Sequence, residues 1–511
     1  MIGAIDVGSN SIRMCIAQVC GKGAYKPLET LTVPVRLGVD TFSIGLISPK
    51  TIQAACDALA GLQKALKSYG VKDVRAVATS AVREASNADT FVDRAESATG
   101  IRLEVIDGID ETRLTYGVVR TNFKDIPDFY TTDTLLLDLG GGSAEITIFH
   151  RGQIIFSETR RIGTLRLREM LGSLPQGKLA DLIQPLVGNV VESVKRLVPL
   201  GELRNFLLIS SDAWHLRPGG ERIEGAGGSV HIDRQEFLAA VNEVVQLSLP
   251  ELVERHGLTI DEAETFTPAL IAINTFLSAT PASHLTLLRV NTLQSLLTAM
   301  ASGGLMPAAD EVEFQEQIAS CAVGIGRKYH FDEPHALRVS HFALQLFDDL
   351  KELHGLGSVE RMMLRVAGIF HDLGFYISTQ AHHKHSMYLV ANSECFGLTN
   401  EQMMLISIIC RYHRRATPRS QHAEYMALTR QHRLLVSKLA AILRIADCLD
   451  RSHTGAIRRF TTILEGGQLV LEVATDEDVT LDELALESKA NLFEQLYGLE
   501  VVMRRIPSVS A

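Results

Sequence analysis

The chain has 511 residues, of which 46% are hydrophobic, and a formal net charge of −10 at pH 7. This length allows several domains with a large buried core. The acidic balance argues against general nucleic-acid binding through a basic surface, and no apolar run approaches membrane-spanning length. Seven cysteines without a CxxC pair and an N-terminus without a basic, then apolar, leader favour a cytoplasmic protein with reduced thiols. We therefore expect neither nucleic-acid nor membrane binding.

A short motif occurs twice in the first 150 residues. Residues 5–11 read IDVGSNS and residues 137–143 read LDLGGGS, so both share Asp, Gly and Ser at the same spacing. Each copy follows apolar residues and precedes a second β-prone run, at 12–19 and 146–149. Strand, glycine turn and strand predict a β-hairpin in each copy. Two matching hairpins indicate two lobes related by duplication.

Glycine turns of this kind suit phosphate binding. Their backbone N–H groups can point inward together and hold phosphate oxygens, with small polar side chains as further donors. The candidate phosphate-binding residues are Gly8, Ser9, Asn10, Ser11, Arg13, Gly140, Gly141, Gly142 and Ser143. Asp6 and Asp138 end the first strands, where a lone carboxylate would repel phosphate unless a hard cation such as Mg²⁺ lay between them. The alternative is two ordinary hairpins whose glycines serve only the turns.

Four segments together carry a family resemblance. They are residues 4–11 (AIDVGSNS), 78–85 (ATSAVREA), 106–118 (IDGIDETRLTYGV) and 138–145 (DLGGGSAE). In this order they resemble the exopolyphosphatase/guanosine pentaphosphate phosphohydrolase (Ppx/GppA) family. The resemblance implies an α/β fold of duplicated actin/sugar-kinase/Hsp70-like (ribonuclease H-like) lobes. It also implies a homodimer.

The resemblance gives roles to individual residues in this cleft. It implies that Glu111 is the general base that accepts a proton from the attacking water, and Arg83 would bind phosphate oxygens as the bond breaks. Asp6, Asp138 and Glu145 would hold Mg²⁺ or Mn²⁺. Each role has a plainer alternative. Glu111 would only favour the N-terminus of a helix, Arg83 would form a surface ion pair with Glu84, and Glu145 would be a solvated strand residue. Arg13 occupies the repeat position of Glu145, so the two lobes differ chemically.

The second lobe departs from its nucleotide-binding relatives. Residues 207–213 (LLISSDA) lack the glycines that would hold a nucleoside, residues 225–229 (GAGGS) read as a turn, and the expected Arg-Glu-Gly turn is missing near 289–300. These losses favour inorganic polyphosphate over guanosine pentaphosphate (pppGpp) as the substrate.

Histidines are concentrated late in the chain, with twelve of seventeen between His330 and His453. Apolar residues at helical spacing in 339–350, 361–370 and 434–449 predict an all-α domain there. It resembles the helical metal-dependent phosphohydrolases named for a His-Asp (HD) doublet. That resemblance implies a divalent transition metal such as Mn, Fe or Zn on His335, His371, Asp372 and Asp447, which His382, His383 and His385 could supplement. The alternative is a vestigial domain whose polar residues bind one another.

The predicted organisation has four modules: a phosphate-binding lobe at 1–125, a second at 126–305, an HD-like helical domain at 306–455 and a small α+β domain at 456–511. In the last we expect a hairpin over 460–473, a helix over 482–497 and a strand over 499–505. The predicted activity is that of an exopolyphosphatase, metal-assisted release of terminal orthophosphate from inorganic polyphosphate. Alternatives are pppGpp 5'-phosphohydrolase activity, nucleotide hydrolysis in the HD-like domain, and a non-catalytic sensor of polyphosphate or nucleotides.

Overall fold

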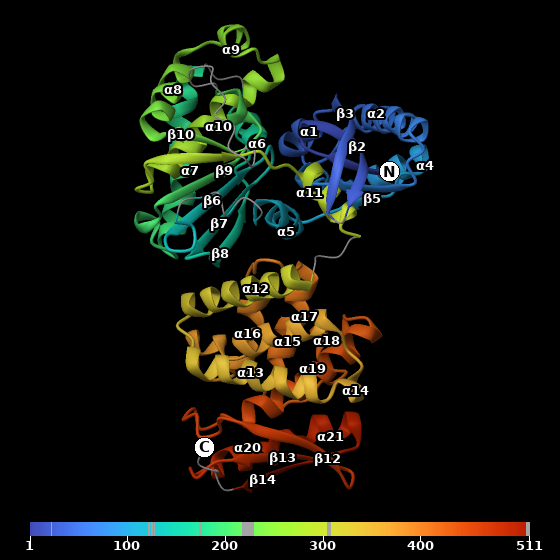
Figure 1. Cartoon of the computed structure of the whole chain (residues 1–511), viewed down its shortest axis with the longest axis vertical. Helices are drawn as coiled ribbons and strands as arrows, with labels where there is room; N and C mark the ends of the chain where they lie inside the picture. Colours follow the sequence, from blue (N-terminus) through green and yellow to red (C-terminus); the bar gives the residue numbers. More distant parts are fainter. Residues whose placement is uncertain are drawn as a thin grey trace. The chain divides into compact units, whose positions relative to one another are not determined.

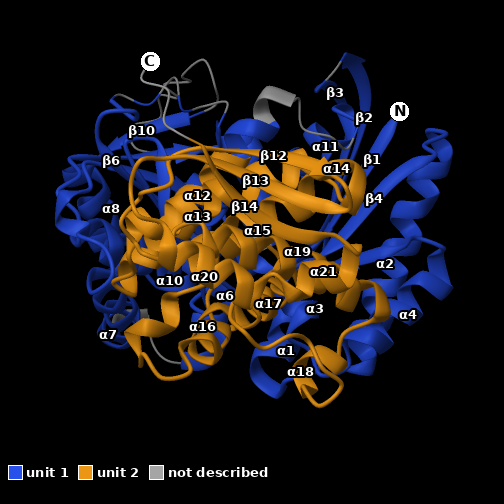
Figure 2. Ribbon diagram, turned by 90° about the horizontal axis from the view of Figure 1, so that it is seen from below, with its two compact units in different colours: residues 1–314 blue, residues 315–511 orange. Residues whose placement is uncertain are grey.

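The computed structural model describes residues 1–21, 23–120, 123, 126, 128–172, 176–216, 229–303 and 308–506. The chain forms two compact units, Met1–Phe314 and Gln315–Ala511, which Figure 2 shows in different colours. Within the described ranges, no helix is long and apolar enough to cross a bilayer. The predicted turn at 225–228 lies outside the described residues, and Ser229 begins a strand.

The first unit contains two sheets with related topology (Figure 1). The five-stranded sheet has the order β3-β2-β1-β4-β5, and the six-stranded sheet has the order β10-β11-β9-β6-β7-β8. In both, the first strand pairs antiparallel with the second and parallel with the fourth, so β1, β2 and β4 correspond to β6, β7 and β9. The predicted duplication is therefore present in the strand order. The strands are β1 (Ile2–Val7), β2 (Ser11–Gly21), β3 (Ala24–Pro34), β4 (Asp73–Ala78), β5 (Leu103–Val105), β6 (Asp133–Leu139), β7 (Ala144–His150), β8 (Gln153–Arg160), β9 (Asn205–Ile209), β10 (Ser229–Asp233) and β11 (His284–Leu288).

Helices cover these sheets through their apolar faces. Two of these helices begin with common N-capping residues. Ser48 caps α2 ahead of Pro49, and Thr259 and Glu262 form a capping box on α10. The helices of this unit are α1 (Leu37–Ile44), α2 (Pro49–Ser68), α3 (Ser80–Arg83), α4 (Ala88–Thr99), α5 (Gly108–Val119), α6 (Thr164–Leu171), α7 (Gln176–Lys195), α8 (Arg234–Gln246), α9 (Leu249–His256), α10 (Ile260–Ser278) and α11 (Thr292–Ala301). Although α11 follows the second sheet in sequence, its Leu296 and Leu297 pack against the first sheet beside Ala4 and Val77. The chain thus returns to the first lobe before it leaves the unit.

The second unit is helical, as predicted, with a small sheet at its end. The elements are α12 (Ala308–Lys328), which contains the boundary between the units, α13 (Glu333–Asp349), α14 (Lys351–His354), α15 (Ser358–Phe370), α16 (His382–Ala391), α17 (Asn400–Arg411), α18 (Ala423–Met426), α19 (Arg430–Cys448), β12 (Phe460–Glu465), β13 (Gln468–Ala474), α20 (Thr480–Lys489), α21 (Asn491–Tyr497) and β14 (Glu500–Ile506). The expected hairpin is β12–β13, and β14 adds to it in parallel.

The single helix predicted over 482–497 was wrong. The structure has two helices separated at Ala490, because the residues on either side of it bind α19. The Lys489 ammonium contacts Asp447, while the Asn491 side chain accepts a 2.8 Å hydrogen bond from Arg444. The two residues that contact α19 thus lie on either side of the break between the helices.

Candidate active site and metal centre

The two glycine turns have the same backbone geometry. In the first, the Gly8 amide donates to the Ser11 carbonyl at 3.1 Å, and in the second the Gly140 amide donates to the Ser143 carbonyl at 3.0 Å. Equal turns give equal registers, because a hairpin's pairing is set by its loop. Asp6 accordingly lies opposite Arg13.

The two turns lie against each other. A Cβ built on Gly141 would sit 3.4 Å from Cβ of Ser9, and one built on Gly142 would collide with the Ser80 hydroxyl. Ser9 and Ser80 are themselves joined by a 3.1 Å hydrogen bond between their hydroxyls. The structure therefore brings together the turns of residues 8–11 and 140–143 and the segment that carries Arg83. Only glycine fits at 142 without moving its neighbours.

Four carboxyl groups lie beside these turns: Asp6 and Glu145 are buried, while Glu111 and Asp138 are partly buried. Burial raises the pKa of Asp6 to about 6, the pKa of Glu111 to about 7 and the pKa of Asp138 to about 7. Burial, and then the charges of Glu111 and Asp138, hold the pKa of Glu145 well above its usual range. Burial is the largest cause of each shift, and neighbouring carboxylates add to it for Glu111, Asp138 and Glu145.

Glu111 and Arg83 form a direct ion pair in this cluster. Nη1 of Arg83 lies 2.7 Å from Oε1 of Glu111 and also donates to the Ile106 carbonyl at 2.6 Å. The alternative Arg83–Glu84 pair does not form, because Glu84 accepts a 2.7 Å hydrogen bond from Arg166. The carboxylate that caps α5 through its side chain is Asp107, which accepts from the Asp110 amide at 2.8 Å. Glu111 is thus left to face the cluster.

The second hairpin has a glutamate at the position where the first has an arginine. Glu145 lies opposite Asp138, in the register position that Arg13 holds opposite Asp6. Glu145 is buried and accepts a 2.7 Å hydrogen bond from the Ser143 hydroxyl, so the reading of it as a solvated strand residue was wrong. The first lobe therefore offsets Asp6 with Arg13 across its hairpin, whereas the second pairs two acids.

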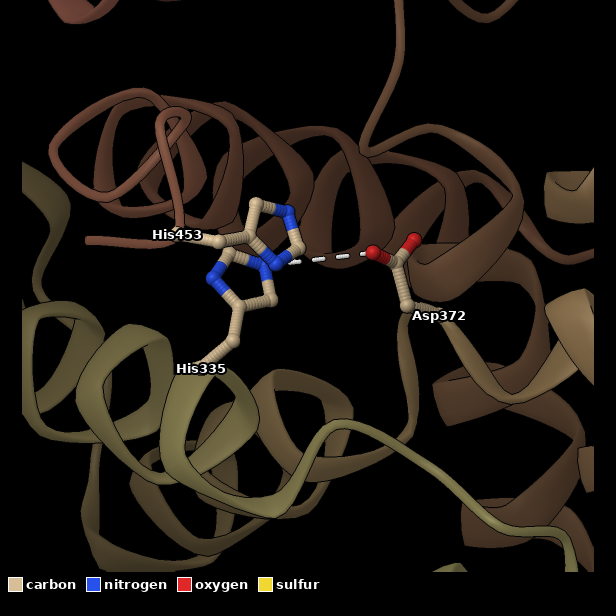
Figure 3. Close-up of side chains that lie close together, drawn as sticks. All are labelled: His335, Asp372 and His453. Atoms are coloured by element: carbon tan, nitrogen blue, oxygen red, sulfur yellow. Dashed lines mark ion pairs between the residues drawn. The ribbon is translucent and has the colours of Figure 1, made fainter.

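The second unit brings together the four histidine and aspartate residues singled out in the sequence. Nε2 of His335 lies 3.2 Å from Nε2 of His371, 3.8 Å from Oδ2 of Asp372 and 3.7 Å from Oδ1 of Asp447. Figure 3 shows the carboxylate of Asp372 facing His335, with the ring of His453 stacked on that of His335 at a centroid distance of 3.7 Å. Close groups of histidine nitrogens and carboxylate oxygens are typical of transition-metal sites.

Comparison with known proteins now decides the family. The model of the Ppx/GppA phosphatase family matches residues 16–287, and that of Ppx/GppA phosphatase domain III matches residues 319–494. The chain belongs to the Ppx/GppA phosphatase family. It is therefore one of a family of phosphoanhydride hydrolases. The match over 319–494 is to the family's own domain III, and the HD-type description of the helical unit stays a prediction.

Several relatives of this Ppx/GppA chain align with almost its whole length. It is 24% identical to a guanosine-5'-triphosphate,3'-diphosphate pyrophosphatase of Photobacterium profundum over 89% of this chain and 88% of the relative. It is also 24% identical to the one of Aeromonas hydrophila subsp. hydrophila over 97% and 96%. Among solved structures, an exopolyphosphatase from Cytophaga hutchinsonii matches with a TM-score of 0.53 and 22% identity, covering 59% of this chain and 98% of that one. An exopolyphosphatase-like protein matches with a TM-score of 0.51, 21% identity and coverage of 58% and 97%. These structures support the fold over the part of the chain that they cover.

The cluster of carboxyl groups in this Ppx/GppA protein fits a hard cation. Oδ1 of Asp6 and Oδ1 of Asn10 are buried, and neither receives a hydrogen bond within the described part of the chain. Buried oxygens without donors beside several carboxylates are the ligands that Mg²⁺ or Mn²⁺ would use.

Sequence reasoning missed one carboxylate at the edge of the cleft. Asp212 follows β9, which pairs in parallel with β6, so it lies at the same sheet edge as Asp138. It is buried and accepts hydrogen bonds from Thr265 at 2.6 Å and Thr164 at 3.3 Å. The polar run that directly follows the apolar strand β9 is the signal in the sequence that identifies it.

In the helical unit, the prediction from the sequence did not include His413 and Lys489. Nε2 of His413 lies 3.3 Å from Oδ1 of Asp372, and His382 lies 3.2 Å from the same oxygen. His383 and His385, which were expected to supplement the site, belong to none of the close groups found among the described residues. Burial opposes ionisation of Asp447, but the ammonium of Lys489 holds its pKa well below the usual range. Burial lowers the pKa of His371 to about 4.

Proposed function

We propose that this phosphatase hydrolyses the terminal phosphoanhydride of a polyphosphorylated anion, with Glu111 as the general base. The observation that carries the proposal is the position of Glu111 near Asp6, Asp138 and Glu145, the carboxyl groups that flank the glycine turns, with a pKa raised to about 7. A base works best when its pKa lies near the working pH, because it is then both ionised and able to hold a proton.

The other groups of the cleft suit the charge that phosphoryl transfer spreads over the oxygens. Backbone amides of the turns other than those of Gly8 and Gly140, which donate within the turns, would bind the phosphate chain from its two sides. Arg83 is already paired with Glu111 and would donate to the phosphate oxygens once substrate is present. Bound Mg²⁺ or Mn²⁺, held by Asp6, Asp138 and Glu145, would offset repulsion between the carboxylates and the substrate.

We propose inorganic polyphosphate as the substrate, and pppGpp is the second candidate. The support for polyphosphate is the strand-to-turn segment at 205–215, which lacks the glycines of a nucleoside site. The support for pppGpp is that relatives aligned over nearly their whole length are named for hydrolysing it. Phosphate release from each substrate by the same preparation separates the two, and a strong preference for pppGpp would overturn the first assignment.

The role of Glu111 is tested with a matched pair of variants. Glu111→Gln keeps the size of the side chain and removes the base, so phosphate release should fall by about 10²-fold or more. Asp110→Asn makes the same change one residue earlier, outside the pair with Arg83, and should retain most of the activity. Equal losses in the two variants would contradict the assignment.

The helical unit supports a second candidate function, hydrolysis of a nucleotide at a divalent transition metal held by His335, His371, Asp372 and Asp447. The observation that favours it is the convergence of these four side chains. If Asp372→Ala abolished phosphate release while Glu111→Gln left it intact, the reaction would belong to this unit. We also propose a homodimer, which light scattering of the purified chain would test.

A further inference from the structure

We propose that Arg166 is a positioning residue for phosphoryl transfer, which aligns the second glycine turn with the segment that carries Arg83. The inference rests on the proposed function, because it concerns the same site. Arg166 lies in the first turn of α6 and contacts a carbonyl of the glycine turn, the carboxylate that follows Arg83 and an aromatic ring of the first lobe. It acts through groups that touch the substrate and does not touch the substrate itself.

The carbonyl groups of the second glycine turn are all bound by residues at the start of α6. Backbone amides of that helix donate to the carbonyls of Gly140 and Gly141 at 2.9 to 3.1 Å. The carbonyl of Gly142 accepts instead from Nε of Arg166, at 2.8 Å. The backbone of α6 therefore fixes two of the three carbonyls, and the direction of the third depends on the side chain of Arg166.

The direction of these carbonyls decides where the next amides point. In a planar trans peptide, the C=O of one residue and the N–H of the next face opposite ways. The amides of Gly141, Gly142 and Ser143 are therefore turned away from α6, and none of them donates to an atom of the described residues. Consecutive amides of this kind form a nest for an anion. Arg166 sets the direction of the Ser143 amide, because it binds the carbonyl of the same peptide group.

The other end of the guanidinium reaches the first lobe. Nη2 of Arg166 donates to Oε1 of Glu84 at 2.7 Å, and Cζ lies 4.0 Å from the ring centroid of Phe42. Glu84 directly follows Arg83, which pairs with Glu111. One planar side chain thus joins the amide nest of the second lobe to the segment of the first lobe that supplies the phosphate-binding arginine.

The first glycine turn has no equivalent of this arginine. It is also bound by the helix that follows its hairpin, since the Gly38 amide donates to the Ser9 carbonyl at 2.8 Å, the register that Leu165 holds in the second lobe. Val39 therefore takes the position of Arg166. The packing of such a turn on its helix does not require an arginine, so the contacts of Arg166 serve the alignment of the two lobes at the site.

The experiment compares kcat and KM for phosphate release from polyphosphate and from pppGpp in wild type and two variants. Arg166→Met keeps an apolar stem over Phe42 and removes both hydrogen bonds, so kcat should fall by about 10–10²-fold and KM should rise. Arg166→Lys keeps the charge but offers one nitrogen where the guanidinium offers two at fixed spacing, so kcat should still fall by about 10-fold. Wild-type kcat in Arg166→Lys would overturn the inference.

Arg168→Met is the matched control on the same helix. Arg168 also donates to a carbonyl, that of Gly172 at 2.7 Å, and to a carboxylate, that of Glu264 at 3.4 Å. Its side chain is 20% exposed, against 13% for Arg166. Because its partners lie outside the two glycine turns, its loss should lower stability without changing kcat or KM. Equal kinetic losses in Arg166→Met and Arg168→Met would show a general effect of α6 and contradict the inference.

A binding measurement separates this inference from the proposed function. In a Glu111→Gln background with Mg²⁺, calorimetric titration with inorganic tripolyphosphate should show affinity weakened by about 10-fold when Arg166→Met is added, and unchanged when Arg168→Met is added. Turnover that persists in Glu111→Gln would contradict Glu111 as the base, and the kinetics of the Arg166 variants would still decide the inference. Unchanged affinity and kcat in Arg166→Met would overturn it while the base stands. Circular dichroism checks folding, and if Arg166→Met does not fold, Arg166→Lys decides.

Discussion

Arg83 donates a 2.7 Å hydrogen bond to Glu111, the residue proposed to remove the proton from water. Burial raises the pKa of Glu111, while the charge and hydrogen bond of Arg83 lower it. The pKa of about 7 is thus a balance between these opposing effects. Any change to Arg83 should therefore alter both the binding of phosphate and the pH range of the base.

Arg83→Gln should lower the phosphate-release rate at neutral pH by about 10²–10³-fold, since a charge-assisted donor to the reacting group is lost. It should also move the acid limb of the kcat/KM profile to higher pH, because Glu111 without its cation keeps its proton longer. The measurement is the pH profile of wild type and variant. Arg75→Gln, which removes an exposed ion pair with Glu104 in the same lobe, is the control and should leave the profile unchanged. An acid limb that stayed in place would contradict the coupling.

The first unit should lose stability with rising pH when metal is absent. The folded pKa values of Asp6, Glu111 and Asp138 exceed their ordinary values, so between about 4 and about 7 the folded state binds more protons than the unfolded state. The free energy of unfolding then falls as pH rises through this window. Calorimetry in chelator should show a transition lowered by about 5 °C or more across it.

Added Mg²⁺ should reverse this trend, because the cation binds the ionised carboxylates. We expect a larger Mg²⁺-induced rise of the transition temperature at a pH of about 8 than at about 5. Asp6→Asn removes one of the repelling charges and should flatten the pH dependence of the metal-free protein. A metal-free protein that became more stable toward neutral pH would contradict the prediction.

Local chemistry explains what the sequence could predict. The two hairpins follow from a repeated Asp-x-Gly turn, and equal turns place Arg13 and Glu145 at equivalent positions. The helices of the second unit follow from apolar spacing, and the four residues predicted to bind a metal there do converge.

Contacts between distant segments account for what was missed. The pairing of Arg83 with Glu111 spans 28 residues, and His413 meets His382 across 31 residues with no local motif. The break at Ala490 lies between Lys489 and Asn491, which both contact α19, and helical periodicity cannot show such contacts. The sequence therefore indicates which residue types bear the chemistry, but tertiary packing determines which of them interact.

Gly163→Ala should disrupt the contact between the two phosphate turns. A Cβ at this position would overlap backbone carbons of Gly141 and Gly142, so the second turn would have to shift. We expect a loss of about 1–3 kcal/mol in the free energy of unfolding and a large fall in phosphate release. Gly188→Ala, inside α7 with nothing within 4 Å of the added carbon, should instead stabilise by up to about 1 kcal/mol. Denaturant unfolding of both variants provides the comparison, and equal effects would contradict it.

Lys489→Met should make the helical unit depend on metal for its stability. The Lys489 ammonium contacts Asp447 in a buried setting, and removing one partner of such a pair costs about 3–5 kcal/mol because the other charge is left uncompensated. A divalent ion at the proposed centre would supply that compensation. Thermal unfolding in chelator should therefore show a large loss for Lys489→Met, and saturation with Mn²⁺ should recover most of it.

The matched control for this change is Lys438→Met. Lys438 donates a 2.7 Å hydrogen bond to the neutral His354 carbonyl, so its removal should cost only about 1 kcal/mol, and Mn²⁺ should not recover it. The difference between the two variants isolates the charge on Asp447 from the general loss of a lysine. If Mn²⁺ stabilised both equally, or left the Lys489→Met loss unchanged, the proposed link between this ion pair and the metal centre would be wrong.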